Sequence, residues 1–240
     1  IDWLRKKGAK VAALRGDREA REGVVIARTS ADNKTGIAFC VSCETDFVSK
    51  NADFVAFAQS IGDAAISNNV KSAEELNNAT INGAKISDLV NDKLASIGEK
   101  IGITKFERVD APFVSSYIHG ANRIGVLVGF NKEAGEAGKD VAMQIAAMNP
   151  VAVDSDSVPA NVVERERAIV TEQIKADPKM AGKPAEMIAK IADGKLNAFF
   201  KEQTLLAQPF VKDAGKSVAD HLKGVDSGLK VTEFKRVALG

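Results

Sequence analysis

Apolar residues near the front of the chain follow first a strand pattern and then a helix pattern. The runs GVVIARTS (23–30) and GIAFCVSC (36–43) favour strands, and the polar cluster ADNKT between them is typical of a hairpin turn. The segment NADFVAFAQSIGDAAIS (51–67) then changes to the spacing of a buried helix face. The positions that keep this spacing are Phe54, Phe57 or Ala58, Ile61 and Ala65. The pattern predicts the order strand, hairpin, strand, helix.

The same order of elements returns further along the chain. The runs FVSSYIHG (113–120) and IGVLVGF (124–130) have strand character, the letters GAN between them suit a turn, and KDVAMQIAAM (139–148) has helix character. The likeness to the first set is greatest where TGIAFCVSC is set against NRIGVLVGF. We therefore predict an α+β fold of two related subdomains, each a small antiparallel sheet covered by helices on one face. A sheet so covered leaves its other face open, so we expect the two sheets to pack together.

A charged helical pattern sets the later part of the chain apart. PANVVERERAIVTEQIKAD and PAEMIAKIADGKLNAFFKE are helices of similar length, and the breaker PKMAGKP lies between them. They predict an antiparallel helical hairpin of coiled-coil type that protrudes from the body. The expected division is a short helical remnant and linker (1–22), a core subdomain N (23–110), the helical hairpin as an insertion (159–201), and a core subdomain C made of 111–158 and 202–240.

Composition and charge narrow the classes of partner. The chain has 33 Lys and Arg residues against 32 Asp and Glu residues, so a net charge of +1 gives no field that would attract nucleic acid. RNA-binding proteins also use aromatic stacking platforms, and one tyrosine gives little sign of them. No apolar run approaches the roughly 20 residues that span a bilayer. These features predict a cytoplasmic protein that binds neither membrane nor nucleic acid directly.

Cys40 and Cys43 have the Cys-x-x-Cys spacing of redox and metal sites. In a strand, however, residues three apart point to opposite faces of the sheet, so the two thiols would not meet. Zinc would need about two further ligands, and His119 and His221 stand far apart in the sequence. We therefore interpret both cysteines as packing residues and His119 as a turn or packing residue, with an enzyme based on the cysteine pair as the alternative.

Sequence motifs for nucleotide or hydrolytic chemistry are also missing. AGKD (137–140) and AGKS (214–217) resemble fragments of a phosphate-binding loop, but the glycine that should come five positions earlier is replaced by Glu133 and Phe210. No G-x-S-x-G, H-E-x-x-H or strand-borne G-x-G-x-x-G occurs. We predict no cofactor, no metal site and no covalent chemistry.

Five segments, in order along the chain, carry a resemblance to a known family. CETDFVSKN, HGANRIGVLV, VAMQIAAMNP, GKPAEMIAKIADGKLNAFFKE and LLAQPFV resemble bacterial-type elongation factor Ts, the nucleotide exchange factor for elongation factor Tu. Each segment alone is weak, but their shared order, the internal repeat and the hairpin together are specific. The resemblance implies a translation elongation factor that binds elongation factor Tu in its GDP-bound and nucleotide-free forms. A non-catalytic interaction module or an RNA- or ribosome-associated protein is the alternative.

The resemblance also implies which residues make contacts. Thr45, Asp46, Phe47 and Val48 would enter the GTPase domain of elongation factor Tu and disturb its Mg²⁺ site. Arg123, Ile124, Gly125 and Val126, together with Gln144, would hold a more distant domain of the same partner, although many family members carry histidine in place of Gln144. The hairpin is a candidate homodimer contact.

Two features of the sequence compete with this interpretation or depart from it. Phe47 precedes Phe54 by seven positions, so one continuous helix would bury both on the same stripe. The family also normally begins with a three-helix module, and only its last helix, predicted as an amphipathic segment over 1–14, matches this chain. We therefore expect a form that lacks most of that module.

Overall fold

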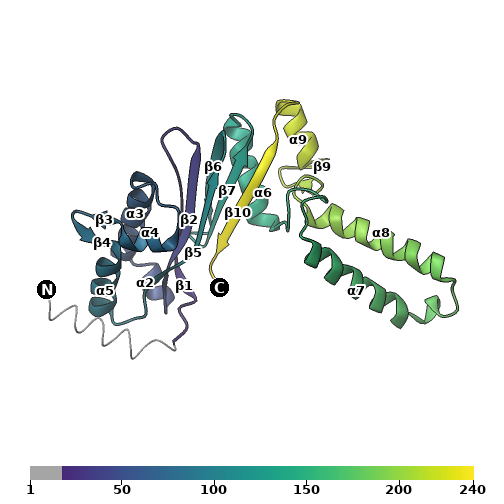
Figure 1. Ribbon diagram of the computed structural model, residues 1–240, viewed down its shortest axis with the longest axis horizontal. Coiled ribbons are helices and arrows are strands. Elements are labelled where there is room, and N and C mark those ends of the chain that lie inside the picture. The colour runs from purple at the N-terminus through teal and green to yellow at the C-terminus, as the bar shows by residue number, and fades with distance from the viewer. Residues whose placement is uncertain (1–17) are drawn as a thin grey trace. The chain divides into compact units, whose positions relative to one another are not determined.

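The computed structural model describes residues 18–240, so the helix predicted over 1–14 lies outside the described residues. Figure 1 shows how the helices and strands follow one another. The described residues form two compact units, one of residues 18–146 with 230–240 and the other of residues 147–229, here called unit one and unit two. Both three-stranded sheets of the structure belong to unit one. The subdomain boundaries expected from the sequence stay predictions.

Unit one contains two three-stranded antiparallel sheets with the same strand order. In each sheet a hairpin supplies an edge strand and the central strand, and a later strand joins the other edge of the central strand. The first sheet has the order β1 (Glu22–Thr29), β2 (Thr35–Cys43) and β5 (Gly102–Asp110). The second has the order β6 (Phe113–His119), β7 (Ile124–Phe130) and β10 (Val231–Ala238). The predicted α+β class and internal repeat are confirmed.

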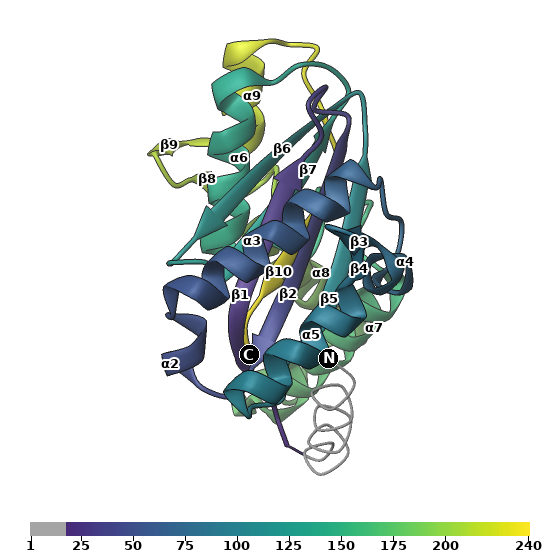
Figure 2. The same ribbon diagram turned by 90° about the vertical axis from the view of Figure 1, so that its left-hand side faces the viewer.

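Helices cover one face of the first sheet (Figure 2). Alternate residues of β1 and β2 turn apolar side chains to this face, as the period of a strand requires. They are Val24, Ile26, Ile37, Phe39, Val41 and Cys43. The fully buried Phe54, Ala58, Ile61 and Ala65 of α3 meet them, so the helix face predicted from the sequence is confirmed. The elements that build this layer are α2 (Asp46–Ser49), α3 (Ala52–Ser67), α4 (Ala73–Asn78), β3 (Thr80–Ile81), β4 (Ala84–Lys85) and α5 (Ile86–Ile97).

The other faces of the two sheets pack on each other. A shared apolar core, here called the inter-sheet core, lies between them: Val25, Ala27, Ala38, Cys40, Val109, Val114, Leu127 and Val237. The sheets approach closely enough that a β-carbon on Gly125 would lie 2.8 Å from a methyl carbon of Val25, and one on Gly36 would lie 2.7 Å from a methyl carbon of Val114. These two positions require glycine because any side chain would collide with the facing sheet. The expected packing of sheet on sheet is confirmed.

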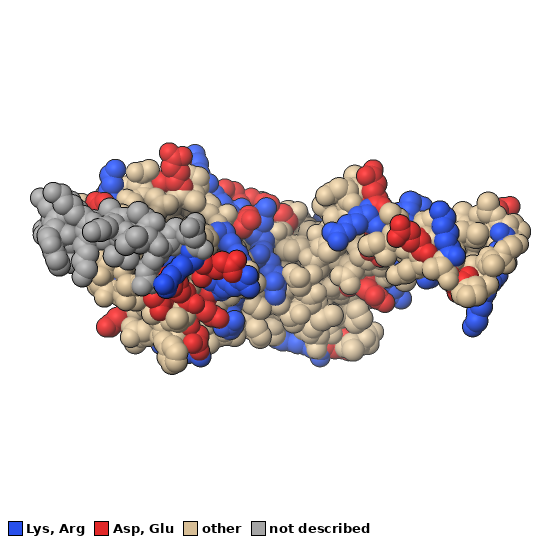
Figure 3. All heavy atoms as spheres, turned by 90° about the horizontal axis from the view of Figure 1, so that it is seen from below, with Lys and Arg blue, Asp and Glu red and all other residues tan. Residues whose placement is uncertain are grey.

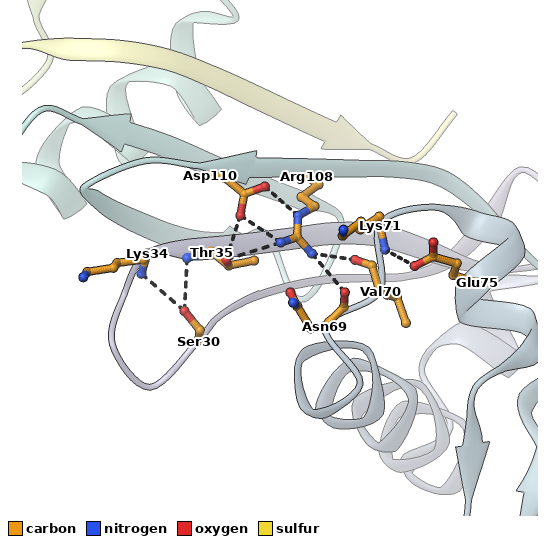
Figure 4. A network of polar contacts seen from close by, with 9 residues as sticks. All are labelled: Ser30, Lys34, Thr35, Asn69, Val70, Lys71, Glu75, Arg108 and Asp110. Carbon is orange, nitrogen blue, oxygen red and sulfur yellow. Dashed lines mark hydrogen bonds and ion pairs between the residues drawn. The ribbon is translucent and has the colours of Figure 1, made fainter.

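A polar network ties the helical layer to the first sheet (Figure 4). The Arg108 guanidinium on β5 donates to the backbone carbonyl of Val70 at 2.8 Å, in the α3–α4 connection, and to the Asp110 carboxylate at 2.7 and 2.9 Å. Asp110 also accepts a hydrogen bond of 2.7 Å from the Thr35 hydroxyl. Arg108 thus donates both to Asp110 on its own strand and to Val70 just after α3. These charge-assisted hydrogen bonds hold the C-terminal end of α3 against the sheet.

The second sheet is covered by α6 (Gly135–Met148), which lies close to β6 and β10. A β-carbon on Gly138 would collide with the Ser115 hydroxyl on β6, so the helix backbone lies close to the strand there. Arg236 on β10 donates to the carbonyl of Ala146 at 3.2 Å. Small residues on one face of α6 therefore allow close packing on this sheet.

Unit two contains the predicted helical hairpin. Helices α7 (Ala160–Ala176) and α8 (Ala185–Gln203) are joined through the 3₁₀ turn η1 (Pro178–Met180), and they bury Val170, Ile174 and Ala192 between them. Arg167 and Asp193 form an ion pair of 3.3 Å across the helices. The remaining elements of the unit are β8 (Pro209–Phe210), β9 (Asp213–Ser217) and α9 (Val218–Val225).

Candidate protein-contact site

The segment predicted to contact a partner lies in the connection between β2 and α3. Thr45 caps the four-residue helix α2, and its hydroxyl accepts a hydrogen bond from the Val48 amide. Asn51 then caps α3 by accepting from the amides of Asp53 and Phe54. Since a capping residue has extended backbone, the cap at Asn51 interrupts what would otherwise be one continuous helix. The local sequence thus builds a separate helical turn.

This interruption puts Phe47 and Phe54 in different environments. The Phe54 side chain is buried with 1% of its surface exposed, whereas Phe47 is 84% exposed. The hypothesis that one helix buries both rings is therefore wrong. Among the large apolar residues that the structure describes, Phe47 is the most exposed. An isolated ring so exposed has no packing role in the folded chain.

Charged and apolar groups lie near Phe47 in the sequence and in the pocket beside it. The Lys50 ammonium bonds to the Asp46 carboxylate at 2.6 Å, and this hydrogen bond is the main reason that the pKa of Asp46 lies below its ordinary value. Asp46 is therefore ionised at neutral pH. A pocket of about 350 Å³ opens beside Phe47 and reaches α5, where Ile97 is 36% exposed. Its lining residues are Phe47, Val48, Asn51, Asp53, Phe54, Lys93 and Ile97.

The second set of predicted contact residues is divided between surface and interior. Arg123 is exposed and forms an ion pair of 3.3 Å with Glu22, and Ile124 is half-buried. Gly125 and Val126 lie inside unit one, and the Gln144 side chain on α6 is fully buried. The surface that this set offers in the described conformation is therefore that of Arg123 and Ile124.

Cys40 and Cys43 point to opposite faces of β2, as predicted from their spacing. The Cys43 side chain belongs to the core under α3, and Cys40 belongs to the inter-sheet core. Burial raises the pKa of Cys40 to about 11. Burial, with the nearby Glu99 carboxylate as the next cause, raises the pKa of Cys43 to about 12. Both thiols are protonated at neutral pH, so neither has the reactivity of a catalytic or ligating thiolate.

Sequence reasoning missed one residue that contacts the site. Glu99 follows the end of α5, and its carboxylate accepts hydrogen bonds from the amides of Glu44 and Thr45, both at 3.1 Å. It also accepts a hydrogen bond of 2.7 Å from the Thr45 hydroxyl. The two segments are more than 50 residues apart in the chain, so no local pattern could have indicated the contact.

The described residues form no metal centre, and the face drawn in Figure 3 has no strongly basic area. Over residues 18–240, no group of three His, Cys, Asp or Glu residues is placed to hold a metal ion. Basic and acidic side chains are intermixed on the face shown in Figure 3. Across the same range, the helices are all too short or too polar to traverse a bilayer. The feature that stands out is an exposed aromatic ring on a capped helical turn. Aromatic residues are enriched in contact surfaces between proteins.

Comparison with known proteins identifies the family of the chain. The family model described as "Elongation factor TS" matches residues 44–240. Elongation factor Ts of Christiangramia forsetii is 45% identical over 243 residues, covering 100% of this chain and 86% of that relative. Those of Flavobacterium psychrophilum and Amoebophilus asiaticus are 44% and 43% identical, covering 100% of this chain and 86% and 87% of the relatives. The protein belongs to the elongation factor Ts family and is thus a translation elongation factor.

Proposed function

We propose that this protein binds elongation factor Tu and promotes release of its GDP, with the exposed ring of Phe47 as the group inserted into the partner. The observation that carries the proposal is the 84% exposure of Phe47 on a helical turn that is capped and tied to the core. A rigid aromatic ring loses little side-chain entropy on insertion and buries on the order of 150 Å². Thr45, Asp46 and Val48 complete the contact segment.

The proposed effect on the nucleotide follows from linkage. A factor that binds the nucleotide-free partner more tightly than the GDP-bound partner must weaken GDP binding by the same ratio. The partner's Mg²⁺ requires nearly octahedral coordination at about 2.1 Å, so a small displacement of its surroundings weakens it. GTP binding then expels the factor, which is recovered unchanged without covalent chemistry. Such a factor needs no cofactor.

The proposed partner surface extends beyond the Phe47 segment. Arg123 and Ile124 would contact a second domain of elongation factor Tu, whereas the buried Gly125, Val126 and Gln144 would not touch it directly. The α7–α8 hairpin, which exposes Ile169 and Met187, stays a candidate homodimer contact, to be tested by light scattering at several concentrations. We propose that the protein acts in the cytoplasm with this partner and without direct contact to nucleic acid.

Release of a fluorescent GDP analogue from elongation factor Tu, followed by stopped flow, tests the proposal. The unmodified chain should accelerate release, and Phe47→Ala should slow the accelerated rate by tenfold or more, which corresponds to about 1.4 kcal/mol. Val225→Ala removes another exposed apolar side chain, 55% exposed in unit two, and should leave the rate unchanged. Binding without acceleration, or equal rates for the chain and Phe47→Ala, would overturn the proposal.

Alanine at both Cys40 and Cys43 separates this function from an enzyme that uses the thiols. Since both side chains are buried and their pKa values are raised, the proposed function requires neither thiol. GDP release should therefore stay within about twofold of the unmodified rate, once any loss of stability is allowed for. Loss of activity in a variant that remains folded would favour thiol chemistry.

A further inference from the structure

Helix α2 has little packing of its own to hold it in place. It has four residues, none of them is buried, and a helix so short is unstable in isolation. Val48 is half-buried and touches the core under α3, while Phe47 extends into solvent. A ring that enters another protein must nevertheless keep a defined direction, because motion in the free state raises the entropy lost on binding. Val48 anchors one side of the helix, and polar contacts at the ends of the segment supply further restraint.

The Glu99 carboxylate supplies such a restraint at the front end. One carboxylate oxygen accepts from two successive amides, those of Glu44 and Thr45, and the other accepts from the Thr45 hydroxyl. The Thr45 hydroxyl in turn accepts from the Val48 amide within α2. A continuous chain of hydrogen bonds thus joins Glu99 to the helix that presents Phe47. Hydrogen bonds to an ionised carboxylate are stronger than those between neutral groups.

A second contact runs in the opposite direction between the same two segments. The Glu44 carboxylate accepts a hydrogen bond of 2.7 Å from the amide of Lys100, next to Glu99, and it pairs with Arg18 at 3.1 Å. Gly98, with φ of 82°, ends α5 in the left-handed region and turns the chain toward Glu99. Each segment therefore accepts from the backbone of the other, which opposes both sliding and rotation between them.

We infer that Glu99 is a positioning residue for the contact segment: it holds the Thr45 cap, and through it the direction of Phe47, so that the ring enters the partner in one orientation. This inference rests on the proposed function. Glu99 acts through Thr45 and is not itself required to touch the partner. Its removal would leave the amides of Glu44 and Thr45 without these acceptors and would let α2 move while Phe47 remained present.

The test compares Glu99→Ala with Glu99→Gln. A glutamine of the same length can still accept from the two amides through its oxygen, and its NH₂ group can donate to the Thr45 hydroxyl. The geometry therefore survives in Glu99→Gln and is lost in Glu99→Ala. Glu74→Ala, an exposed glutamate of α4 in the same unit, is the matched control for charge removal.

Two measurements are made on each variant. In GDP release from elongation factor Tu, Glu99→Ala should lower the saturating rate at least fivefold and change the half-saturating concentration less than twofold, whereas Glu99→Gln and Glu74→Ala should stay within twofold on both. In the free protein, hydrogen exchange of the Glu44 and Thr45 amides should speed up at least tenfold in Glu99→Ala only. Thermal unfolding verifies that each variant is folded.

The outcomes separate this inference from the proposed function. If the unmodified chain fails to release GDP, the proposed function fails, and the positioning role in exchange fails with it. If the chain is active and folded Glu99→Ala keeps its saturating rate, the positioning inference alone is overturned. A raised half-saturating concentration with an unchanged saturating rate would also overturn it, since Glu99 would then be a binding contact. Unchanged amide exchange in Glu99→Ala would show that Glu99 does not hold the segment.

Discussion

The two sheets of unit one have the same strand order, yet the connections that leave their central strands differ. From β2 the chain passes through the capped turn α2 and exposes Phe47 before α3 begins. From β7 it passes through residues 131–134, where the Asn131 side chain accepts a hydrogen bond of 2.8 Å from the amide of Lys230, and Ala134 is buried. One connection exposes an aromatic ring, and the other is hydrogen-bonded to the residue just before β10.

This difference indicates which part of a repeated fold can vary without disturbing its core. The strands of both repeats are constrained by the inter-sheet core, where exchange of an apolar residue would disturb packing on both sides. The connections contribute no residue to the inter-sheet core, so they are less constrained. One repeat can therefore present the proposed contact segment while the other has a short loop without an exposed ring. Four predictions test how far the two repeats differ, beginning with the largest expected effect.

The first prediction contrasts the two phenylalanines on either side of the Asn51 cap. Phe54→Ala removes a buried ring from the core under α3 and should lower the free energy of unfolding by about 3–5 kcal/mol. Phe47→Ala removes an exposed ring and should change it by less than about 0.5 kcal/mol. Urea denaturation measures both. Equal losses would mean that Phe47 packs in solution and that the two connections are not distinct.

The second prediction concerns Gly125, on the central strand of the second sheet. Gly125→Ala places a methyl group 2.8 Å from Val25 of the first sheet and should cost about 1–3 kcal/mol of stability through overpacking. Gly194→Ala, in the interior of α8 with open space around it, is the control and should stabilise by about 0.5–1 kcal/mol. A neutral Gly125→Ala in thermal unfolding would show that the sheets can separate at little cost.

The third prediction addresses the plain connection directly. Asn131→Ala removes the acceptor for the Lys230 amide and should lower the free energy of unfolding by about 1 kcal/mol. GDP release should stay within twofold of the unmodified rate, because this connection has no part in the proposed contact. A tenfold slower release in a folded variant would contradict the distinction between the repeats.

The fourth and smallest effect is a pH dependence confined to the first sheet. The hydrogen bond from Arg108 holds the pKa of Asp110 below its ordinary value of 3.8. Ionised Asp110 therefore adds stability that is fully present above that value and is lost as pH falls through the lowered pKa of the folded state. The Asp110 side chain is 57% exposed, so the contribution should be below about 1 kcal/mol.

Urea denaturation from pH 2.5 to 7 measures this contribution in the unmodified chain and in Asp110→Asn. The difference in unfolding free energy should be constant above about pH 5 and should shrink as the solution is acidified further. A difference that stays constant down to the lowest pH would show that ionisation of Asp110 does not stabilise the Arg108 network.

The sequence predicted the strands, the repeat and the helical hairpin because each depends on local periodicity. The buried face of α3, for example, follows from the spacing of Phe54, Ala58 and Ile61. The backbone conformation of Lys105 could not be predicted from local periodicity. Lys105 has φ of 56° where the pairing of β2 with β5 changes register, although it is not a glycine. Tertiary packing stabilises that bulge, and local propensity gives no sign of it.

The contact role of the segment around Phe47 stays a prediction, and its local structure follows from the sequence only in part. Thr45 and Asn51 are residue types that favour helix caps. Whether such caps interrupt the helix depends on competition with the apolar stripe that would join Phe47 to Phe54. The burial of Val126 and Gln144 was not visible locally, since it depends on how α6 and the second sheet pack. Glu99 was missed because its partner segment lies far away in the chain.

The pairing of β10 with β7 has a consequence for the order in which the chain can fold. Val231 pairs with Phe130, a partner about a hundred residues earlier, whereas the two hairpins close over a few residues. During synthesis, one edge of β7, the central strand of the second sheet, therefore stays unpaired until all of unit two has been made and β10 follows. Completion of unit one is thus among the late events of folding, and a nascent chain that stops before residue 231 carries an open β-edge.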